Sequence, residues 1–174
     1  GYVIALARET FQIDRYIRDG HWPKPRGISL MGKTVALLGY GDVGKNVAKR
    51  MLSSGMKVVA YDPYVISDNQ ISAVEHEKWP KRIDEADFIV ITCSLTKSSR
   101  HMIDEKLLKN VKSGVRIVNV GRGPIIDETA LESALISEKV YSAALDVFEI
   151  EPLPINSYLR SHSRCVLGSH NASN

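Results

Sequence analysis

Short apolar runs alternate with amphipathic segments along most of the chain. The apolar runs lie at residues 35–38, 58–60, 88–92, 115–120, 142–147 and 165–168. Runs of this length, bounded by glycine, proline and polar clusters, are typical of buried strands. Helical patterns lie between them, at residues 43–52, 83–86, 104–110 and 127–137, with Asp127 as an expected N-cap. Residues 67–79 are polar and have no clear pattern. Alternating strands and helices predict an α/β fold with a doubly wound parallel sheet.

The first 26 residues differ from the rest of the chain. Residues 3–18 have a helical pattern, and the sequence HWPKPRG then predicts a proline-rich linker. Two interpretations stay open: a solvated helix that caps the sheet, or an arm that docks onto another domain or subunit. Apolar side chains lie on more than one side of this helix, which favours a partner and predicts a homodimer. We therefore divide the chain into an arm and linker at 1–26 and a core at 27–174.

Residues 35–62 contain the most informative motif. Gly39, Gly41 and Gly44 form G-x-G-x-x-G between an apolar strand and a helix, and Asp62 ends the next strand. A glycine triplet alone is a weak signal, but this context is what a dinucleotide-binding fingerprint requires. Gly39 permits the tight turn, Gly41 lets the backbone approach a pyrophosphate, and Gly44 lets helix and strand pack closely. The alternative is a glycine-rich turn followed by an incidental aspartate.

The same segment predicts which dinucleotide binds. N–H groups at the start of the helix would bind the phosphates. Asp62 would accept hydrogen bonds from the adenosine ribose and would repel a 2′-phosphate, so we expect NAD rather than NADP. We also place Asp42, Val43 and Tyr61 in the cofactor site. The side chain of Asp42 is expected to point to solvent, because it brings a negative charge close to the phosphate turn.

Composition narrows the class of protein without identifying it. The chain has 174 residues, 25% of them charged, and a net charge of +3, with no dense Lys/Arg run. These values fit one globular domain and give no support for nucleic-acid binding. No segment is long enough for a membrane span. Cys93 and Cys165 lack C-x-x-C or His-rich neighbours, so we expect no metal site and no disulfide, but reduced thiols in a cytoplasmic protein.

Polar residues follow four of the predicted strands. In a doubly wound sheet, ligands bind outside the carboxyl ends of the strands. Arg122, Glu151 and His170 would therefore lie at the same edge as the glycine motif. Hydride transfer to a keto acid needs such a set, because Arg binds a carboxylate and polarises a carbonyl, and His supplies a proton. Alternatively, Arg122 is a solvated turn residue, His170 a surface histidine and Glu151 a loop charge.

The motifs together resemble the nucleotide-binding domain of the D-isomer-specific 2-hydroxyacid dehydrogenases, a family that includes phosphoglycerate dehydrogenase. The similarity follows nearly the whole chain in order, through GYGDVGKNVAKRM, VVAYDPY, EADFIVITCSLTKSSRHMI, VRIVNVGRGPIIDETALESAL, ALDVFEIEPLP and GSHNAS. It implies a Rossmann fold, an NAD cofactor, and hydride transfer between NAD(H) and a D-2-hydroxy acid or 2-keto acid. It also implies dimerisation through this domain.

The resemblance assigns roles by position. It makes Arg122 the substrate-binding and polarising arginine, Glu151 the partner acid, His170 the acid/base, and Asp146 the residue that holds the nicotinamide carboxamide. His101 matches a position where the family often has histidine, but we assign it no catalytic role. Further residues are expected to line the cofactor cleft: Cys93, Ser94, Ser99, Val120, Gly121, Arg122, His170 and Ala172.

The chain departs from the family in two ways. Ser94 and Ser169 stand where the family usually has proline. The family also has a second domain that closes over the cofactor, so this chain resembles an excised domain, which we expect to be inactive alone. Two other functions stay open: an NADH-sensing dimeric corepressor, and a stand-alone nucleotide-binding module.

Overall fold

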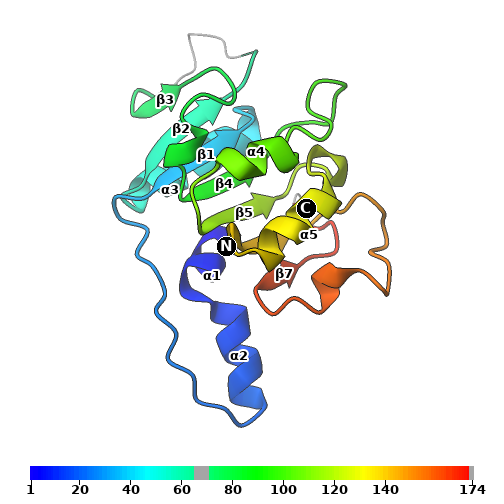
Figure 1. The fold of residues 1–174 in the computed structure, drawn as a ribbon. Coiled ribbons are helices and arrows are strands. Elements are labelled where there is room, and N and C mark those ends of the chain that lie inside the picture. The colour runs from blue at the N-terminus through cyan, green and yellow to red at the C-terminus, as the bar shows by residue number, and fades with distance from the viewer. Residues whose placement is uncertain (65–70, 173–174) are drawn as a thin grey trace.

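The computed structural model describes residues 1–64 and 71–172. Seven strands form one sheet in the order β3-β2-β1-β4-β5-β6-β7 (Figure 1), and every neighbouring pair is parallel. The predicted doubly wound α/β fold is confirmed. The strands are β1 (Thr34–Leu38), β2 (Lys57–Tyr61), β3 (Val74–His76), β4 (Phe88–Ile91), β5 (Val115–Asn119), β6 (Val140–Leu145) and β7 (Cys165–Leu167).

Helices cover both faces of the sheet. The helices are α1 (Tyr2–Arg8), α2 (Thr10–Arg18), α3 (Asp42–Ser53), α4 (Glu105–Asn110) and α5 (Glu128–Ile136), and single 3₁₀ turns lie at Ile83–Glu85, Gly123–Ile125 and Tyr158–Arg160. Leu37 of β1 packs in a cluster with residues of α1 and α3, whereas Leu38 packs with residues of α4 and α5. Successive strand residues thus bury both faces, as expected for a parallel sheet. The predicted N-cap is confirmed, since the Asp127 side chain accepts a hydrogen bond from Ala130 N.

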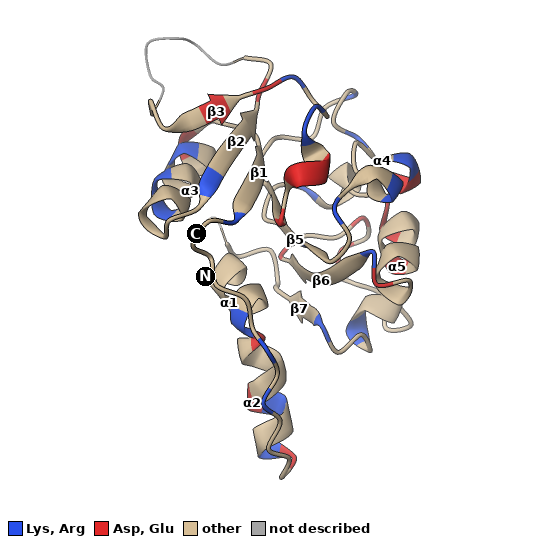
Figure 2. Cartoon of the chain, turned by 60° about the vertical axis from the view of Figure 1, so that its left-hand side comes forward, with Lys and Arg blue, Asp and Glu red and all other residues tan. Residues whose placement is uncertain are grey.

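The prediction of one helix over residues 3–18 is wrong. The chain breaks at Glu9, which has φ 55° and ψ 33° in the left-handed region, and the Glu9 carboxylate accepts a hydrogen bond from the Tyr141 hydroxyl. The helix α1 buries Val3, Leu6 and Ala7 against the sheet. By contrast, α2 has no buried residue and projects from the body, with the following linker running beside it (Figures 1 and 2). The projecting arm therefore consists of α2 and the linker alone.

The expected bounds of one strand also need correction. The strand expected at 142–147 is β6 (Val140–Leu145), so Asp146 follows the strand. Within α3 the fully buried face is formed by Gly44, Ala48 and Met51, whereas Val43 is exposed. Of the unassigned residues 67–79, three form the short edge strand β3, and 67–70 lie outside the described residues. Among the residues that the structure describes, no helix is long and apolar enough to cross a membrane.

Candidate cofactor and catalytic site

The glycine turn between β1 and α3 is shaped by close packing. Gly39 has φ 94°, and a Cβ there would lie 2.7 Å from Cys93 N. A Cβ on Gly44 would lie 2.2 Å from Gly39 O, so the helix closes directly onto the turn. A Cβ on Gly41 would meet nothing within 4 Å. Gly41 therefore leaves open space at the N-terminus of α3, where a pyrophosphate would approach the backbone. These residues fit a dinucleotide.

The turn is also supported from β4, by a residue that the sequence analysis missed. Thr92 Oγ1 lies 3.1 Å from Leu38 O and 3.0 Å from Gly39 O, within hydrogen-bond distance of both carbonyls. The available sequence signal was the position of Thr92, a polar residue directly after the wholly buried strand β4. Thr92 joins the end of β4 to the glycine turn.

Asp62 is held at the end of β2 by backbone of the same turn. Its Oδ2 accepts a hydrogen bond from Tyr40 N at 2.7 Å, and its Oδ1 accepts one from Tyr64 N at 2.9 Å. Each carboxylate oxygen can accept a second bond, so ribose hydroxyls have acceptors here.

Tyr61 does not present its side chain to this site. The side chain is buried, the hydroxyl donates a hydrogen bond to Lys81 O, and the ring packs edge-on against Trp79. Burial raises the pKa of Tyr61 to about 12. Only the backbone of Tyr61 reaches the turn, where its carbonyl accepts a hydrogen bond from Gly39 N.

The loop after β4 lines the next part of the cleft. The Ser99 hydroxyl donates a hydrogen bond to Ser94 O and accepts one from Thr96 N. Ser99 is buried and so shapes the loop, while Ser94 is exposed. Burial raises the pKa of Cys93 to about 11, so this thiol is protonated at neutral pH. A Cβ on Gly121 would lie 2.7 Å from Cys93 O, which shows how closely the loops after β4 and β5 approach.

Arg122 lies on a tight turn after β5. Asn119 organises this turn, because its Oδ1 accepts a hydrogen bond from Gly121 N and its Nδ2 donates one to Arg122 O, both at 3.0 Å. Arg122 is exposed, and one guanidinium nitrogen donates to Gly121 O. A Cβ on Gly123 would overlap Phe148 O at 1.8 Å, so the turn lies directly against the segment that carries Glu151. Val120, at the start of the turn, donates its N–H to Ile91 O.

Glu151 and His170 are in direct contact. Glu151 Oε2 lies 2.8 Å from His170 Nδ1, and Glu151 Oε1 accepts a hydrogen bond from Phe148 N. The hydrogen bond with His170 lowers the pKa of Glu151, and the positive charges of His170 and Arg122 lower it further. With Nδ1 engaged by the carboxylate, Nε2 is the ring nitrogen that remains for a substrate.

Asp146 joins three segments beneath this pair. It is 2% exposed, its Oδ2 accepts a hydrogen bond from Ala172 N at 2.8 Å, and its backbone carbonyl accepts one from His170 N. The Tyr2 hydroxyl of α1 lies 3.4 Å from Asp146 Oδ1, a contact that sequence reasoning missed. Burial, with the charge of Asp146, raises the pKa of Tyr2. Asp146 therefore positions His170 as well as facing the cleft.

A cavity of about 670 Å³ opens beside the catalytic candidates. It is large enough for a small organic acid. The Glu151–His170 contact, the exposed Arg122 and the glycine turn all follow carboxyl ends of strands, at one edge of the parallel sheet. The cavity is lined by the segments after β6 and β7, including Asp146, Phe148, Glu151, Arg160 and His170.

Comparison with known proteins agrees with this geometry. Residues 1–172 match the family model of the D-isomer specific 2-hydroxyacid dehydrogenase, NAD binding domain. The chain is 42% identical over 154 residues to a hydroxypyruvate reductase of Thermotoga maritima, covering 87% of this chain and 50% of that protein. It is 41% identical over 169 residues to D-3-phosphoglycerate dehydrogenase 3 of Arabidopsis thaliana, covering 95% of this chain and 29% of that protein.

A solved structure shares the fold. The D-isomer specific 2-hydroxyacid dehydrogenase from Xanthobacter autotrophicus, in complex with NADPH and MES, aligns with a TM-score of 0.86 at 28% identity, over 97% of this chain and 54% of that one. The chain thus spans about half or less of the length of these relatives. All three are enzymes, which gives the corepressor alternative no support. A match over nearly every residue, together with the phosphate turn and Asp62, shows that the chain belongs to the NAD-binding domain family of the D-isomer specific 2-hydroxyacid dehydrogenases.

Proposed function

We propose that the protein containing this chain is an NAD-dependent oxidoreductase that interconverts a D-2-hydroxy acid and its 2-keto acid. The observation that carries the proposal is the contact between Glu151 and His170, at the sheet edge where Arg122 is exposed. That set can bind an acid and transfer a proton, next to a turn that fits a dinucleotide. The relatives, a reductase and two dehydrogenases, support the same reaction class.

Four side chains would act in keto-acid reduction. The bound nicotinamide would supply the hydride. The guanidinium of Arg122 would pair with the substrate carboxylate and polarise the carbonyl to be reduced. His170 would donate the proton on Nε2 to the carbonyl oxygen as negative charge develops there. Glu151 would hold the imidazole through Nδ1 and stabilise its protonated form. Asp146 would orient the carboxamide of the cofactor, and oxidation would use the same groups in reverse.

The preferred cofactor is NAD(H). Asp62 places a carboxylate, fixed by Tyr40 N and Tyr64 N, where the adenosine ribose of a dinucleotide lies in this fold. A 2′-phosphate there would meet a like charge. The Xanthobacter structure holds NADPH, so the family fold alone does not decide between the cofactors. The proposed preference for NAD(H) therefore depends on Asp62.

We place the rest of the substrate-binding site outside this chain. The catalytic set occupies one wall of a cleft, and the chain covers 50% of the hydroxypyruvate reductase that it matches. We place the loops that read the substrate side chain in a second domain that closes over the cofactor. Within this chain, we keep residues 27–174 as the nucleotide-binding core, with α1 packed onto it.

The protein is proposed to be a homodimer that acts in the cytoplasm. The arm presents large apolar side chains to solvent, with Phe11 48%, Ile17 40% and Trp22 77% exposed. Burying such a surface against a second copy would stabilise a dimer. Cys93 and Cys165 are free thiols, which suits a reducing compartment.

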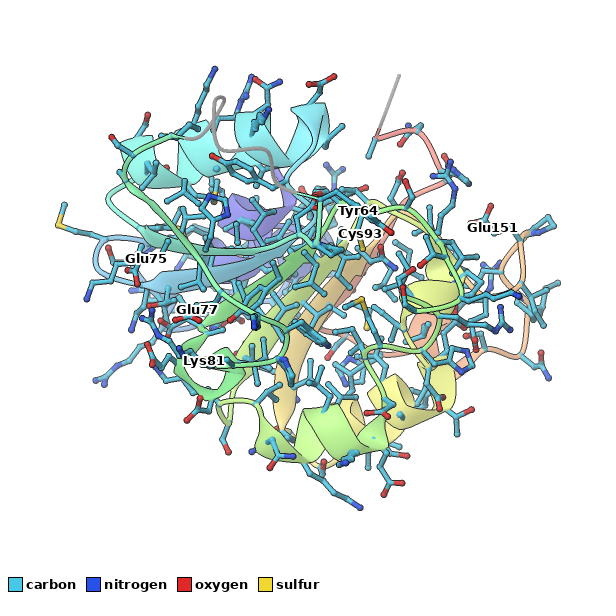
Figure 3. All side chains as sticks on the ribbon, turned by 90° about the horizontal axis from the view of Figure 1, so that it is seen from above. Tyr64, Glu75, Glu77, Lys81, Cys93 and Glu151 are labelled. Carbon is cyan, nitrogen blue, oxygen red and sulfur yellow. The ribbon has the colours of Figure 1, made fainter. Side chains whose placement is uncertain are left out.

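Oxidation of NADH by the full-length protein, with a panel of 2-keto acids, tests the proposal. At least one acid is expected to be reduced at an ordinary enzymatic rate. Arg122→Ala and His170→Ala should each reduce kcat/KM by about 10²–10⁴-fold while NADH affinity stays within several-fold. Arg82→Ala is the matched control, because Arg82 pairs with Glu75 and Glu85 near the far edge of the sheet (Figure 3 labels Glu75). Absence of turnover with every acid would overturn the assignment.

A further inference from the structure

A second histidine–glutamate contact lies beside the catalytic pair. His101 Nε2 contacts Glu149 Oε1, and Glu149 precedes Glu151 by two residues. We infer that His101 and Glu149 form a positioning pair that holds Glu151 in place against His170. This inference rests on the proposed function, in which Glu151 and His170 act together.

His101 is rigidly attached to the turn that carries Arg122. Its backbone N–H donates a hydrogen bond to Pro124 O at 2.9 Å, and two residues later Ile103 N donates to Ile125 O. Its φ of 50° lies in the left-handed region, a conformation that a non-glycine residue keeps only where its surroundings impose it. The imidazole therefore projects from a backbone that is joined to the residues directly after Arg122.

Glu149 receives this imidazole on the segment after β6. Its backbone N–H donates a hydrogen bond to Glu128 Oε1 at 2.5 Å, and the neighbouring Phe148 N donates to Glu151 Oε1 at 3.0 Å. The segment 148–151 is thus held by one side chain from α5, by its own Glu151, and by His101. Of these contacts, the one between His101 and Glu149 joins the segment 148–151 to the loop after β4.

Electrostatics explains why Glu149 needs a partner. Burial raises the pKa of Glu128, the hydrogen bond from Glu149 N lowers it, and the charges of Glu149, Glu132 and Glu151 raise it again. Several carboxylates are therefore close enough to repel one another. With His101 on Glu149 and His170 on Glu151, each carboxylate has its own nitrogen partner. Without His101, Glu149 would turn toward solvent and draw the 148–151 backbone with it.

The pair acts through Glu151 rather than on the substrate. The Nε2 atom of His101 is engaged by Glu149, and the two side chains are 39% and 26% exposed. Their connection to the reacting groups runs through the backbone from Glu149 to Glu151 and through the Arg122 turn. The expected signature is thus a smaller loss of kcat than that caused by removing His170, with cofactor affinity retained.

The kinetic test compares alanine and glutamine variants of the full-length protein. His101→Ala and Glu149→Ala should each lower kcat for keto-acid reduction about 10-fold, less than the roughly 10²–10⁴-fold expected of a general acid, with KM for NADH within about 2-fold. His101→Gln keeps a side-chain N–H donor and Glu149→Gln keeps an oxygen acceptor, so both should recover most of the activity. In a double-mutant cycle the two alanine effects should be far from additive. The control is His162→Ala, since His162 packs on Tyr158.

A second measurement does not depend on turnover. The pKa of Glu151 is read from the ¹³C shift of its carboxylate in the full-length protein. Loss of the Glu149 charge alone would lower this pKa, whereas loss of the His170 contact would raise it. We expect it to rise in Glu149→Ala. If the wild-type protein shows no turnover, the proposed function is refuted. A rise in the pKa of Glu151 in Glu149→Ala would still support the positioning pair. An unchanged or lower pKa in Glu149→Ala, or additive kinetic losses, would overturn the inference. If the alanine variant fails to fold, Glu149→Ser removes the contact in its place.

Discussion

Oε2 of Glu151 lies 2.8 Å from Nδ1 of His170, a contact that joins the segments after the last two strands of the sheet. The hydrogen bond from His170 is the largest cause that lowers the pKa of Glu151. The carboxylate is therefore ionised throughout the neutral range. Because its folded pKa is lowered, its contribution to stability is present above its ordinary titration range and is lost as the pH falls through the lowered value.

Neutralising this acid should change the pH profile of the enzyme. In Glu151→Gln, the imidazole of His170 loses the carboxylate charge that favours its protonated form. The basic limb of the kcat/KM profile for keto-acid reduction should move to lower pH in the full-length protein. Glu105→Gln is the control, because Glu105 is an exposed partner of Lys109 on α4. An unchanged basic limb in Glu151→Gln would show that the pair does not set the protonation of His170.

Asp62 provides a test of cofactor choice. Asp62→Asn removes the negative charge. The amide oxygen of asparagine can still accept a hydrogen bond from the backbone N–H of Tyr40 or Tyr64, which both donate to Asp62 in the wild-type protein. The electrostatic repulsion of a 2′-phosphate should then weaken by a few kcal/mol. The ratio of the dissociation constants of NADPH and NADH should therefore fall about 10–100-fold. Calorimetric titration of both cofactors measures the ratio. Wild-type protein that binds NADPH as tightly as NADH would refute the role of Asp62.

The predicted core strands agree with the structure because burial on both faces leaves an unambiguous local pattern. Where the chain forms irregular structure, the pattern is weaker. The residues from 3 to 18 have continuous helical periodicity, yet the helix breaks at Glu9, where the hydroxyl of Tyr141, far away in sequence, donates a hydrogen bond to the Glu9 carboxylate. No local signal encodes that contact. The strand β3 (Val74–His76) is three residues long, too short for periodicity to identify.

The site shows the same limit. Glycine spacing and strand ends indicated the phosphate turn and the edge where Arg122, Glu151 and His170 lie. The sequence motif places Tyr61 in the cleft, but side chains alternate along a strand, and the Tyr61 side chain shares the α4/α5 face of the sheet with Val59. The supports supplied by Thr92, Asn119 and Tyr2 depend on three-dimensional contacts, and only the position of Thr92 and Asn119 at strand ends hinted at them.

Asp42 should affect cofactor binding and stability in opposite directions. It is an exposed acid in the first turn of α3, next to the expected pyrophosphate position. Asp42→Asn removes a like charge and should tighten NADH binding about 2–10-fold at low salt, with a smaller gain at high salt. It also removes a favourable interaction with the helix dipole, so the thermal midpoint without cofactor should fall by about 1–2 °C. Titration and calorimetry on one preparation measure both. NADH binding that weakens would contradict the expected geometry.

The arm makes the oligomeric state testable. Phe11 and Ile17 of α2 are 48% and 40% exposed, and α2 buries none of its residues on the body. Full-length wild-type protein should sediment as a dimer at micromolar concentration, whereas Phe11→Glu with Ile17→Glu should shift it toward monomer. The matched control is Ile136→Glu on α5, an apolar residue that is 64% exposed outside the arm. A wild-type protein that stays monomeric at tens of micromolar would refute the dimer.

The 174-residue chain by itself should bind NADH but catalyse almost nothing. The phosphate turn, Asp62 and Asp146 all lie within it, so cofactor affinity should largely survive. Catalysis needs a substrate held beside the nicotinamide away from water, and such positioning supplies about 7–11 kcal/mol of barrier reduction. Arg122 is exposed here, and in open solvent it would hold a carboxylate only weakly. NADH oxidation by this chain with any keto acid should therefore be orders of magnitude slower than by the full-length protein. A comparable rate would show that the substrate site is complete within these residues and that no second domain is needed.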